Sequence, residues 1–157
     1  VTPAHRQEEA TIAVRHILLS ASATTDAAKA AARKEAESVY AKYQKNPSEA
    51  TFIRLAMAYS GDGNYASGGI YEGVYPGQMV DSFNNWCFDE ARKPGDTDIV
   101  DTTYGSHIMY FLGNDLPRWQ TLVRDTIVSE SYKEISDKIS TDSITVLDAL
   151  IADLTIQ

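Results

Sequence analysis

Two histidines and one aspartate are the main candidates for chemistry in this 157-residue chain, and they are far apart in the sequence. His16 and His107 lie in strand-like segments, and Asp62 lies in a glycine-rich loop. A histidine within a strand is usually a hydrogen-bonded core residue, and an aspartate in such a loop often only stabilises a turn. The residue types alone therefore leave a structural and a chemical role open for all three.

Two kinds of site have no support in the sequence. No close pair such as CxxC or HExxH anchors a metal site, so His16, His107, Asp62 and Cys87 are not predicted to bind a metal, and no cofactor is expected. A serine hydrolase is disfavoured because no GxSxG motif is present. Cys87 is the only cysteine and has aromatic neighbours, so we predict that it packs as a small apolar residue.

The composition narrows the range of partners. A hydrophobic fraction of 43% with 23% charged residues is typical of a folded globular chain. The net charge of -8 argues against general binding to nucleic acid or anionic membranes, which requires clustered Lys and Arg. No stretch reaches the roughly 20 apolar residues of a membrane span, so no direct membrane insertion is expected.

The elements that must position His16 begin with a strand. The run Thr11–Ser20 is rich in aliphatic and β-branched residues, and its alternation places Ile12, Val14, His16 and Leu18 on one face. Two helices are then predicted. The first has helix-capping residues around Thr25 and apolar residues at helical spacing through Tyr43, and the second is expected to begin at an Asn46 cap.

The remaining candidates lie on shorter elements. A glycine-rich loop spans 60–69 and contains Asp62, and a short strand is expected at 70–75. A short helix is predicted to carry Phe83, and strand-like runs at 98–103 and 106–112 follow it, joined by a tight turn at 104–105. The order of helices and strands predicts an α+β fold with a small, mainly antiparallel sheet covered by helices.

Two amphipathic segments lie beyond Pro117, one containing Val128, Tyr132, Ile135 and Ile139, the other Leu147, Leu150, Ile151 and Leu154. Such apolar stripes need a partner. They could pack on each other, on a second copy in a homodimer, or on missing parts of a longer parent chain.

Four motifs occur in the sequence order and at nearly the spacing found in parvulin-type peptidyl-prolyl cis/trans isomerases, and together they span about residues 13–112. They are VRHILL (14–19), LAMAYSGD (55–62), GQMVDSF (77–83) and TTYGSHI (102–108). The chain therefore resembles the parvulin (PpiC-type rotamase) family, and is most similar to its bacterial extracytoplasmic foldases.

The resemblance implies roles for particular residues. His16 and His107 resemble the two buried histidines of the parvulin site, Thr102 the hydroxyl residue linked to them, and Asp62 an Asp or Cys beside the substrate. The residues matching the proline pocket are Tyr71, Met79, Phe83, Phe88 and Tyr104, with Tyr71 standing where many members have Leu. From spacing alone these apolar residues would be ordinary core, and the resemblance reverses that interpretation for Met79 and Phe83.

The implied function is isomerisation of X-Pro bonds in unphosphorylated, unfolded or exported polypeptides, without a cofactor. Residues 20–26 contain no Lys or Arg to pair with a phosphate. The alternative is a catalytically weak chaperone module that binds unfolded chains.

The resemblance also implies an organisation and a location. We expect an N-terminal segment at 1–11, an isomerase domain at 12–115 and a helical extension at 116–157. The start has no signal-peptide core, so we interpret it as a boundary within a longer parent. That parent is expected to be extracytoplasmic or on the cell surface, with its signal and anchor outside these residues.

Overall fold

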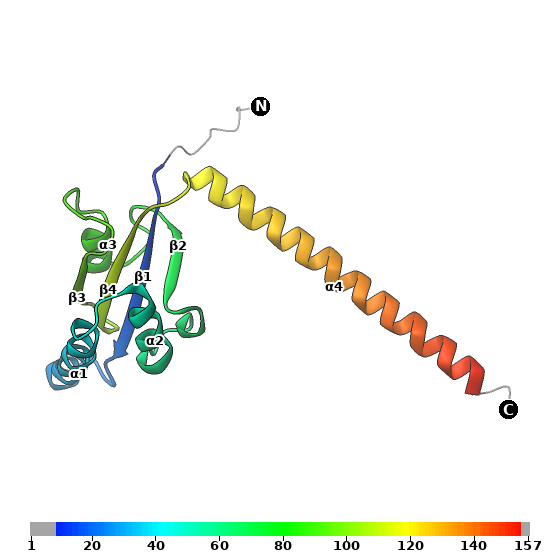
Figure 1. Cartoon of the computed structure of the whole chain (residues 1–157), viewed down its shortest axis with the longest axis horizontal. Coiled ribbons are helices and arrows are strands. Elements are labelled where there is room, and N and C mark those ends of the chain that lie inside the picture. Colours follow the sequence, from blue (N-terminus) through cyan, green and yellow to red (C-terminus); the bar gives the residue numbers. More distant parts are fainter. Residues whose placement is uncertain (1–8, 155–157) are drawn as a thin grey trace. The chain divides into compact units, whose positions relative to one another are not determined.

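The computed structural model describes the backbone of residues 9–154 and the side chains of residues 9–140. Within this part, four strands form one antiparallel sheet in the order β2-β1-β4-β3 (Figure 1). The elements are β1 (Ile12–Ser20), α1 (Asp26–Gln44), α2 (Glu49–Tyr59), the 3-10 turn η1 (Tyr65–Ser67), β2 (Ile70–Val74), α3 (Asp81–Cys87), β3 (Thr97–Asp101), β4 (Gly105–Asn114) and α4 (Arg118–Leu154). The predicted α+β fold with an antiparallel sheet is confirmed.

The two faces of the sheet carry separate apolar clusters. One cluster packs against α1 and α2 and includes Ile17 and Ile108, which have no exposed surface. The other packs against α3 and includes Val14 and Met109 from the same two strands. Because successive side chains of a strand point to opposite faces, β1 and β4 are buried on both sides.

Strand pairing places both site histidines on the face that α3 covers. His16 of β1 is opposite Met109, and His107 of β4 is opposite Leu18. The histidines are therefore diagonal neighbours on two paired strands, although 91 positions separate them in the sequence. His16 lies on a central strand of the sheet, since β1 has β2 on one side and β4 on the other.

The helix starts agree with the sequence in one case and differ in the other. The Thr25 hydroxyl accepts a hydrogen bond from the Ala28 N–H at 3.3 Å and caps α1 as predicted. At α2 the cap is Ser48, whose hydroxyl accepts from the Thr51 N–H at 3.2 Å. The prediction of an Asn46 cap was wrong, because the extended backbone of Ser48 places the cap two residues later.

Gly69 lets the loop that carries Asp62 lie against β1. Its carbonyl accepts a hydrogen bond from the His16 N–H at 2.8 Å, and its φ of 69° is one that glycine adopts readily. A Cβ atom at this position would lie 2.1 Å from the His16 carbonyl oxygen. Any other residue would therefore push the loop away from the strand that holds His16.

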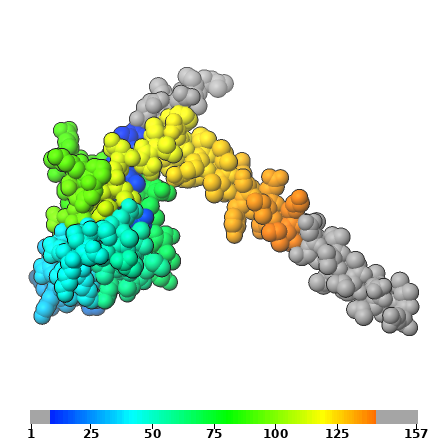
Figure 2. Space-filling model, viewed as in Figure 1, coloured from blue at the N-terminus to red at the C-terminus, as the bar shows by residue number. Residues whose placement is uncertain are grey.

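The chain divides into one compact unit that ends at Arg118 and a second that begins at Trp119. The second unit is a single helix, where the sequence predicted two separate segments; its first part is yellow to orange in Figure 2. No Gly or Pro interrupts residues 118–154, so nothing ends the helix between them.

A continuous helix cannot fold back on itself, so the alternative in which the two segments pack on each other was wrong. The side chains of Leu147, Leu150, Ile151 and Leu154 lie outside the described residues. No helix in the described part of the chain is long and apolar enough to cross a membrane.

Candidate functional site

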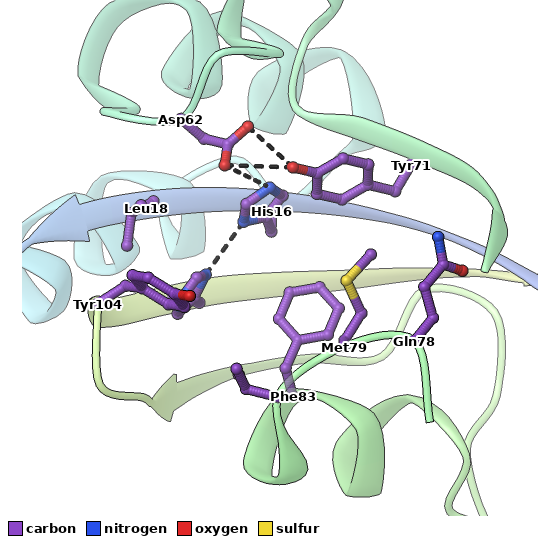
Figure 3. Close-up of a pocket in the computed structure, with 10 residues that line it drawn as sticks. His16, Leu18, Asp62, Tyr71, Gln78, Met79, Phe83 and Tyr104 are labelled. Atoms are coloured by element: carbon purple, nitrogen blue, oxygen red, sulfur yellow. Dashed lines mark hydrogen bonds and ion pairs between the residues drawn. The ribbon is translucent and has the colours of Figure 1, made fainter. Parts of the chain in front are cut away.

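A cavity of about 290 Å³ opens beside the two histidines on the α3 face of the sheet (Figure 3). Its walls come from β1, β4, the loop after α2, β2, the segment leading into α3, α3 itself, and the turn between β3 and β4. The lining residues are His16, Leu18, Asp62, Tyr71, Gln78, Met79, Val80, Phe83, Tyr104 and His107. The fold thus brings the four sequence motifs to one place.

The predicted site residues line this cavity with two exceptions, Thr102 and Phe88. Thr102 lies behind His107 and hydrogen-bonds it. Phe88 packs against the apolar cluster on the α3 face and is not among the residues that line this cavity, so its place in the pocket wall stays a prediction.

Leu18, Gln78 and Val80 line the cavity but were not among the predicted site residues. A signal existed for Leu18, because the strand alternation had already placed it on the same face as His16. Gln78 and Val80 flank Met79 in the segment before α3, and nothing in their spacing points to a pocket.

The floor of the cavity is a hydrogen-bonded pair of imidazoles. The Nδ1 atoms of His16 and His107 are 3.1 Å apart, and the two rings are stacked with centroids 5.3 Å apart. His107 Nε2 lies 2.9 Å from the Thr102 hydroxyl oxygen. His16 and His107 are buried, with exposed fractions of 1% and 5%, so water does not compete for these hydrogen bonds. The contacts therefore fix the orientations of both rings.

Burial keeps both histidines neutral. It lowers the pKa of His16 from 6.5 to about 4, with the Asp62 carboxylate partly opposing the shift. Burial, and next the neighbouring His16, lower the pKa of His107 to about 4. Each ring therefore carries one N–H and one bare nitrogen near pH 7.

A single direction of hydrogen bonding suits this arrangement. If the Thr102 hydroxyl donates to His107 Nε2, the His107 Nδ1–H donates to His16 Nδ1. The N–H of His16 is then on Nε2, where it faces the Asp62 Oδ2 at 3.7 Å, too far for a hydrogen bond but favourable for charge. The reverse direction would point a lone pair of His16 at the carboxylate, so we assign the first.

Asp62 is held at the edge of the cavity by two donors. The Tyr71 hydroxyl lies 3.1 Å and 3.2 Å from its two carboxylate oxygens, as the dashed lines in Figure 3 mark. The backbone N–H of Asn64 donates to Oδ1 at 3.0 Å. The Tyr71 ring in turn stacks on His16 with centroids 4.8 Å apart, so tyrosine, carboxylate and histidine form one connected group.

The apolar wall consists mainly of Met79 and Phe83. Phe83 is 3% exposed and meets the His16 and His107 rings edge-on, with centroids 5.6 Å away in each case. Met79 is partly buried against the same cluster, and Tyr104 is 63% exposed at the rim. The cavity therefore has a small apolar binding surface, a polar but uncharged floor, and one carboxylate at its edge.

Cys87 does not belong to the site. It is buried in the cluster under α3, and burial raises the pKa of its thiol to about 12, which agrees with packing as a small apolar residue. Among the side chains that the structure describes, no group of three or more His, Cys, Asp or Glu residues could hold a metal ion.

Comparison with known proteins identifies the family of the chain. Residues 2–114 match a family model described as a PPIC-type PPIase domain. No curated protein sequence matches the chain.

Solved structures show the same fold. A PpiC-type peptidyl-prolyl cis-trans isomerase domain superposes with a TM-score of 0.59 at 20% identity, covering 71% of this chain and 96% of that one. PrsA from Bacillus subtilis gives 0.51 at 26% identity, covering 79% of this chain and 42% of that one. The peptidylprolyl isomerase PrsA from Bacillus anthracis gives 0.51 at 21% identity, covering 82% and 52%. This chain therefore spans about half the length of the two PrsA proteins.

Proposed function

Because the chain belongs to the family of PpiC-type peptidyl-prolyl cis-trans isomerase domains, we propose that it acts on X-Pro bonds of unphosphorylated polypeptides. The observation that carries this proposal is the small apolar cavity beside a neutral histidine pair. Its volume of about 290 Å³ lies at the low end for ligand pockets, which suits one proline ring better than a cofactor.

The required catalysis is modest. Rotation about an X-Pro bond faces a barrier of about 18–20 kcal/mol, because the planar amide loses its resonance as it twists. A thousandfold to ten-thousandfold acceleration needs about 4–5.5 kcal/mol of preferential stabilisation of the twisted state. No covalent step is needed.

Each part of the site has a proposed share in this stabilisation. Met79, Phe83 and Tyr104 hold the proline ring, while the chain on its N-terminal side remains free to rotate. The histidine pair and Thr102 keep the floor rigid and uncharged. A dry, apolar surrounding disfavours the planar amide, which is the more polarised form.

Asp62 adds an electrostatic contribution. The carbonyl oxygen is more negative in the planar amide than in the twisted one, because resonance draws electron density from nitrogen to oxygen. A carboxylate near this oxygen raises the energy of the planar form more than that of the transition state. Asp62 has the position for this role, at the cavity edge and held by Tyr71.

The charges of the cavity favour unphosphorylated substrates. No Lys or Arg is among its lining residues, and its one carboxylate would repel a phosphate group. Peptides with phosphoserine before proline should therefore be poorer substrates than peptides with an apolar residue.

We also propose that the substrates are exported or unfolded proteins and that the parent protein works outside the cytoplasm. The four motifs that resemble bacterial extracytoplasmic foldases support this, as does the likeness to PrsA from Bacillus subtilis. Fractionation of the source cells, with an antibody raised against this chain, would test the location.

A chaperone activity is the second candidate, and α4 favours it. Its described part exposes more than half the surface of Leu122, Ile127, Val128, Tyr132 and Ile139. Exposed apolar side chains along a helix can bind unfolded polypeptide segments. Isomerase and chaperone activities could coexist in one chain.

The deciding experiment is a protease-coupled isomerisation assay on proline tetrapeptides that differ in the residue before proline. We expect acceleration with apolar residues and much less with phosphoserine or glutamate. Rates equal to buffer across the panel would refute the isomerase proposal and leave the chaperone candidate.

A further inference from the structure

Tyr71 hydrogen-bonds Asp62, which is a contact that an apolar pocket wall does not require. Its hydroxyl lies within hydrogen-bond distance of both carboxylate oxygens, at 3.1 Å and 3.2 Å. Among the described residues, Tyr71 is the one side chain that hydrogen-bonds Asp62; the other donor is the backbone N–H of Asn64. Tyr71 therefore restrains the carboxylate from the side of the sheet.

Asp62 depends on this restraint because of its place in the chain. It lies between Gly61 and Gly63, in a loop without regular secondary structure, and its side chain is 20% exposed. The backbone donor reaches only Oδ1, so without Tyr71 the Oδ2 atom has no hydrogen-bond donor from the described residues. The carboxylate would then keep only the Asn64 N–H at Oδ1 and the 3.7 Å charge contact between Oδ2 and His16 Nε2, and it could turn more readily towards water.

Tyr71 itself is firmly placed. It lies on β2 opposite Val14, and its ring stacks on His16 with an interplanar angle of 20°. Burial, and next the Asp62 charge, raise the pKa of Tyr71 to about 12, so its hydroxyl remains a donor throughout the working pH range. The residue is thus a fixed support with a constant protonation state.

We propose that Tyr71 is a positioning residue that holds the Asp62 carboxylate at the cavity edge beside His16, where its charge faces the carbonyl that rotates. The proposal rests on the role of Asp62 given above. The interaction of a charge with a carbonyl dipole weakens with distance and is screened by water. A carboxylate that swings into solvent would lose most of its effect on the rate.

Two other roles for the Tyr71 hydroxyl predict different kinetics. A hydroxyl that contacts the substrate directly would contribute to the rate whether or not Asp62 is present. A tyrosine that serves only as an apolar wall would affect peptide binding, and the loss of its hydroxyl would not alter kcat. A double-mutant cycle separates these roles from positioning.

The test compares the unmodified chain with Tyr71→Phe, Asp62→Ala and the double variant, measuring kcat and KM separately on one unphosphorylated X-Pro peptide. Tyr71→Phe keeps the ring on His16 and removes only the hydroxyl. We expect it to lower kcat about tenfold or more with KM unchanged, in line with the loss of one hydrogen bond to a charged group. The double variant should be no slower than Asp62→Ala alone. Tyr65→Phe, in the same loop region but outside the cavity, is the matched control and should behave as the unmodified chain.

Several results would overturn the proposal. Additive losses in the double variant would mean that the hydroxyl acts directly on the substrate, and a raised KM with unchanged kcat would mean a wall role. A slow Asp62→Ala with a fully active Tyr71→Phe would remove the positioning role while leaving the role of Asp62 intact. A fully active Asp62→Ala would instead refute the role of Asp62 itself, and with it the basis of this inference. Urea midpoints are measured for every variant, and Tyr71→Leu replaces Tyr71→Phe in the cycle if the latter does not fold.

Discussion

Mild acidification should destabilise this protein through its two buried histidines. Burial lowers the pKa of both His16 and His107 from 6.5 to about 4 in the folded chain. The unfolded chain, with ordinary values near 6.5, therefore binds more protons between pH 6.5 and pH 4. Stability must fall as the pH drops through this window, because protons favour the state that binds more of them.

The size of the effect follows from the two pKa values. Between pH 7.5 and 5.5, each histidine should reduce the free energy of unfolding by about 1.4 kcal/mol, and the pair by about 3 kcal/mol. Folded molecules should keep both rings neutral at pH 5.5, which is above about 4. We therefore expect a loss of stability in this range without protonation of the histidine pair in the folded state.

Urea unfolding at pH 7.5 and 5.5, followed by tryptophan fluorescence to which the buried Trp86 contributes, measures this loss. The control is the variant His16→Gln/His107→Gln, whose amides can hydrogen-bond but do not titrate. Its stability should change by less than about 1 kcal/mol over the same range. If the control lost as much stability as the unmodified chain, other groups would be responsible and the reasoning from the histidine pair would fail.

Three further predictions concern the pocket, metal dependence and the helical extension. Met79→Ala should lower turnover more than stability, because Met79 is only partly buried, whereas Phe83→Ala should unfold much of the protein at a cost of about 3–5 kcal/mol. Separate kinetic and urea measurements on each variant test this, and a Met79→Ala variant that simply unfolds would contradict the pocket assignment. EDTA should leave the isomerase rate unchanged, and a rate lost with chelator and restored by zinc would contradict this. A chain ending after Arg118 keeps the Arg118 contacts to Glu9 and Tyr75, so it should stay folded and active on short peptides. In a light-scattering assay it should suppress the aggregation of an unfolded protein less than the full chain does. Equal suppression by both chains would remove the chaperone role of α4.

The sequence predicted the helices and strands of the compact unit well, but it predicted the exact ends of the helices less well. Strand alternation placed His16 on the same face as Val14 and Leu18, and the structure agrees. The cap of α2 was misplaced by two residues, because Asn46 and Ser48 are both good caps and only the backbone conformation decides between them. Phe88 follows α3 as its C-cap residue, so the direction of its side chain depends on the backbone where that helix ends.

The amino-acid sequence by itself determined the fold class, because periodicity depends on residues near one another in the chain, and its four motifs indicated the candidate site residues through their resemblance to the parvulin family. Only the tertiary structure decided how these residues are joined. The 3.1 Å contact between His16 and His107 depends on the register of β1 and β4, and the bond from Tyr71 to Asp62 depends on the course of the loop past Gly69. Register and loop path are set by packing across the whole sheet, so no local pattern predicts which side chains meet within hydrogen-bond distance.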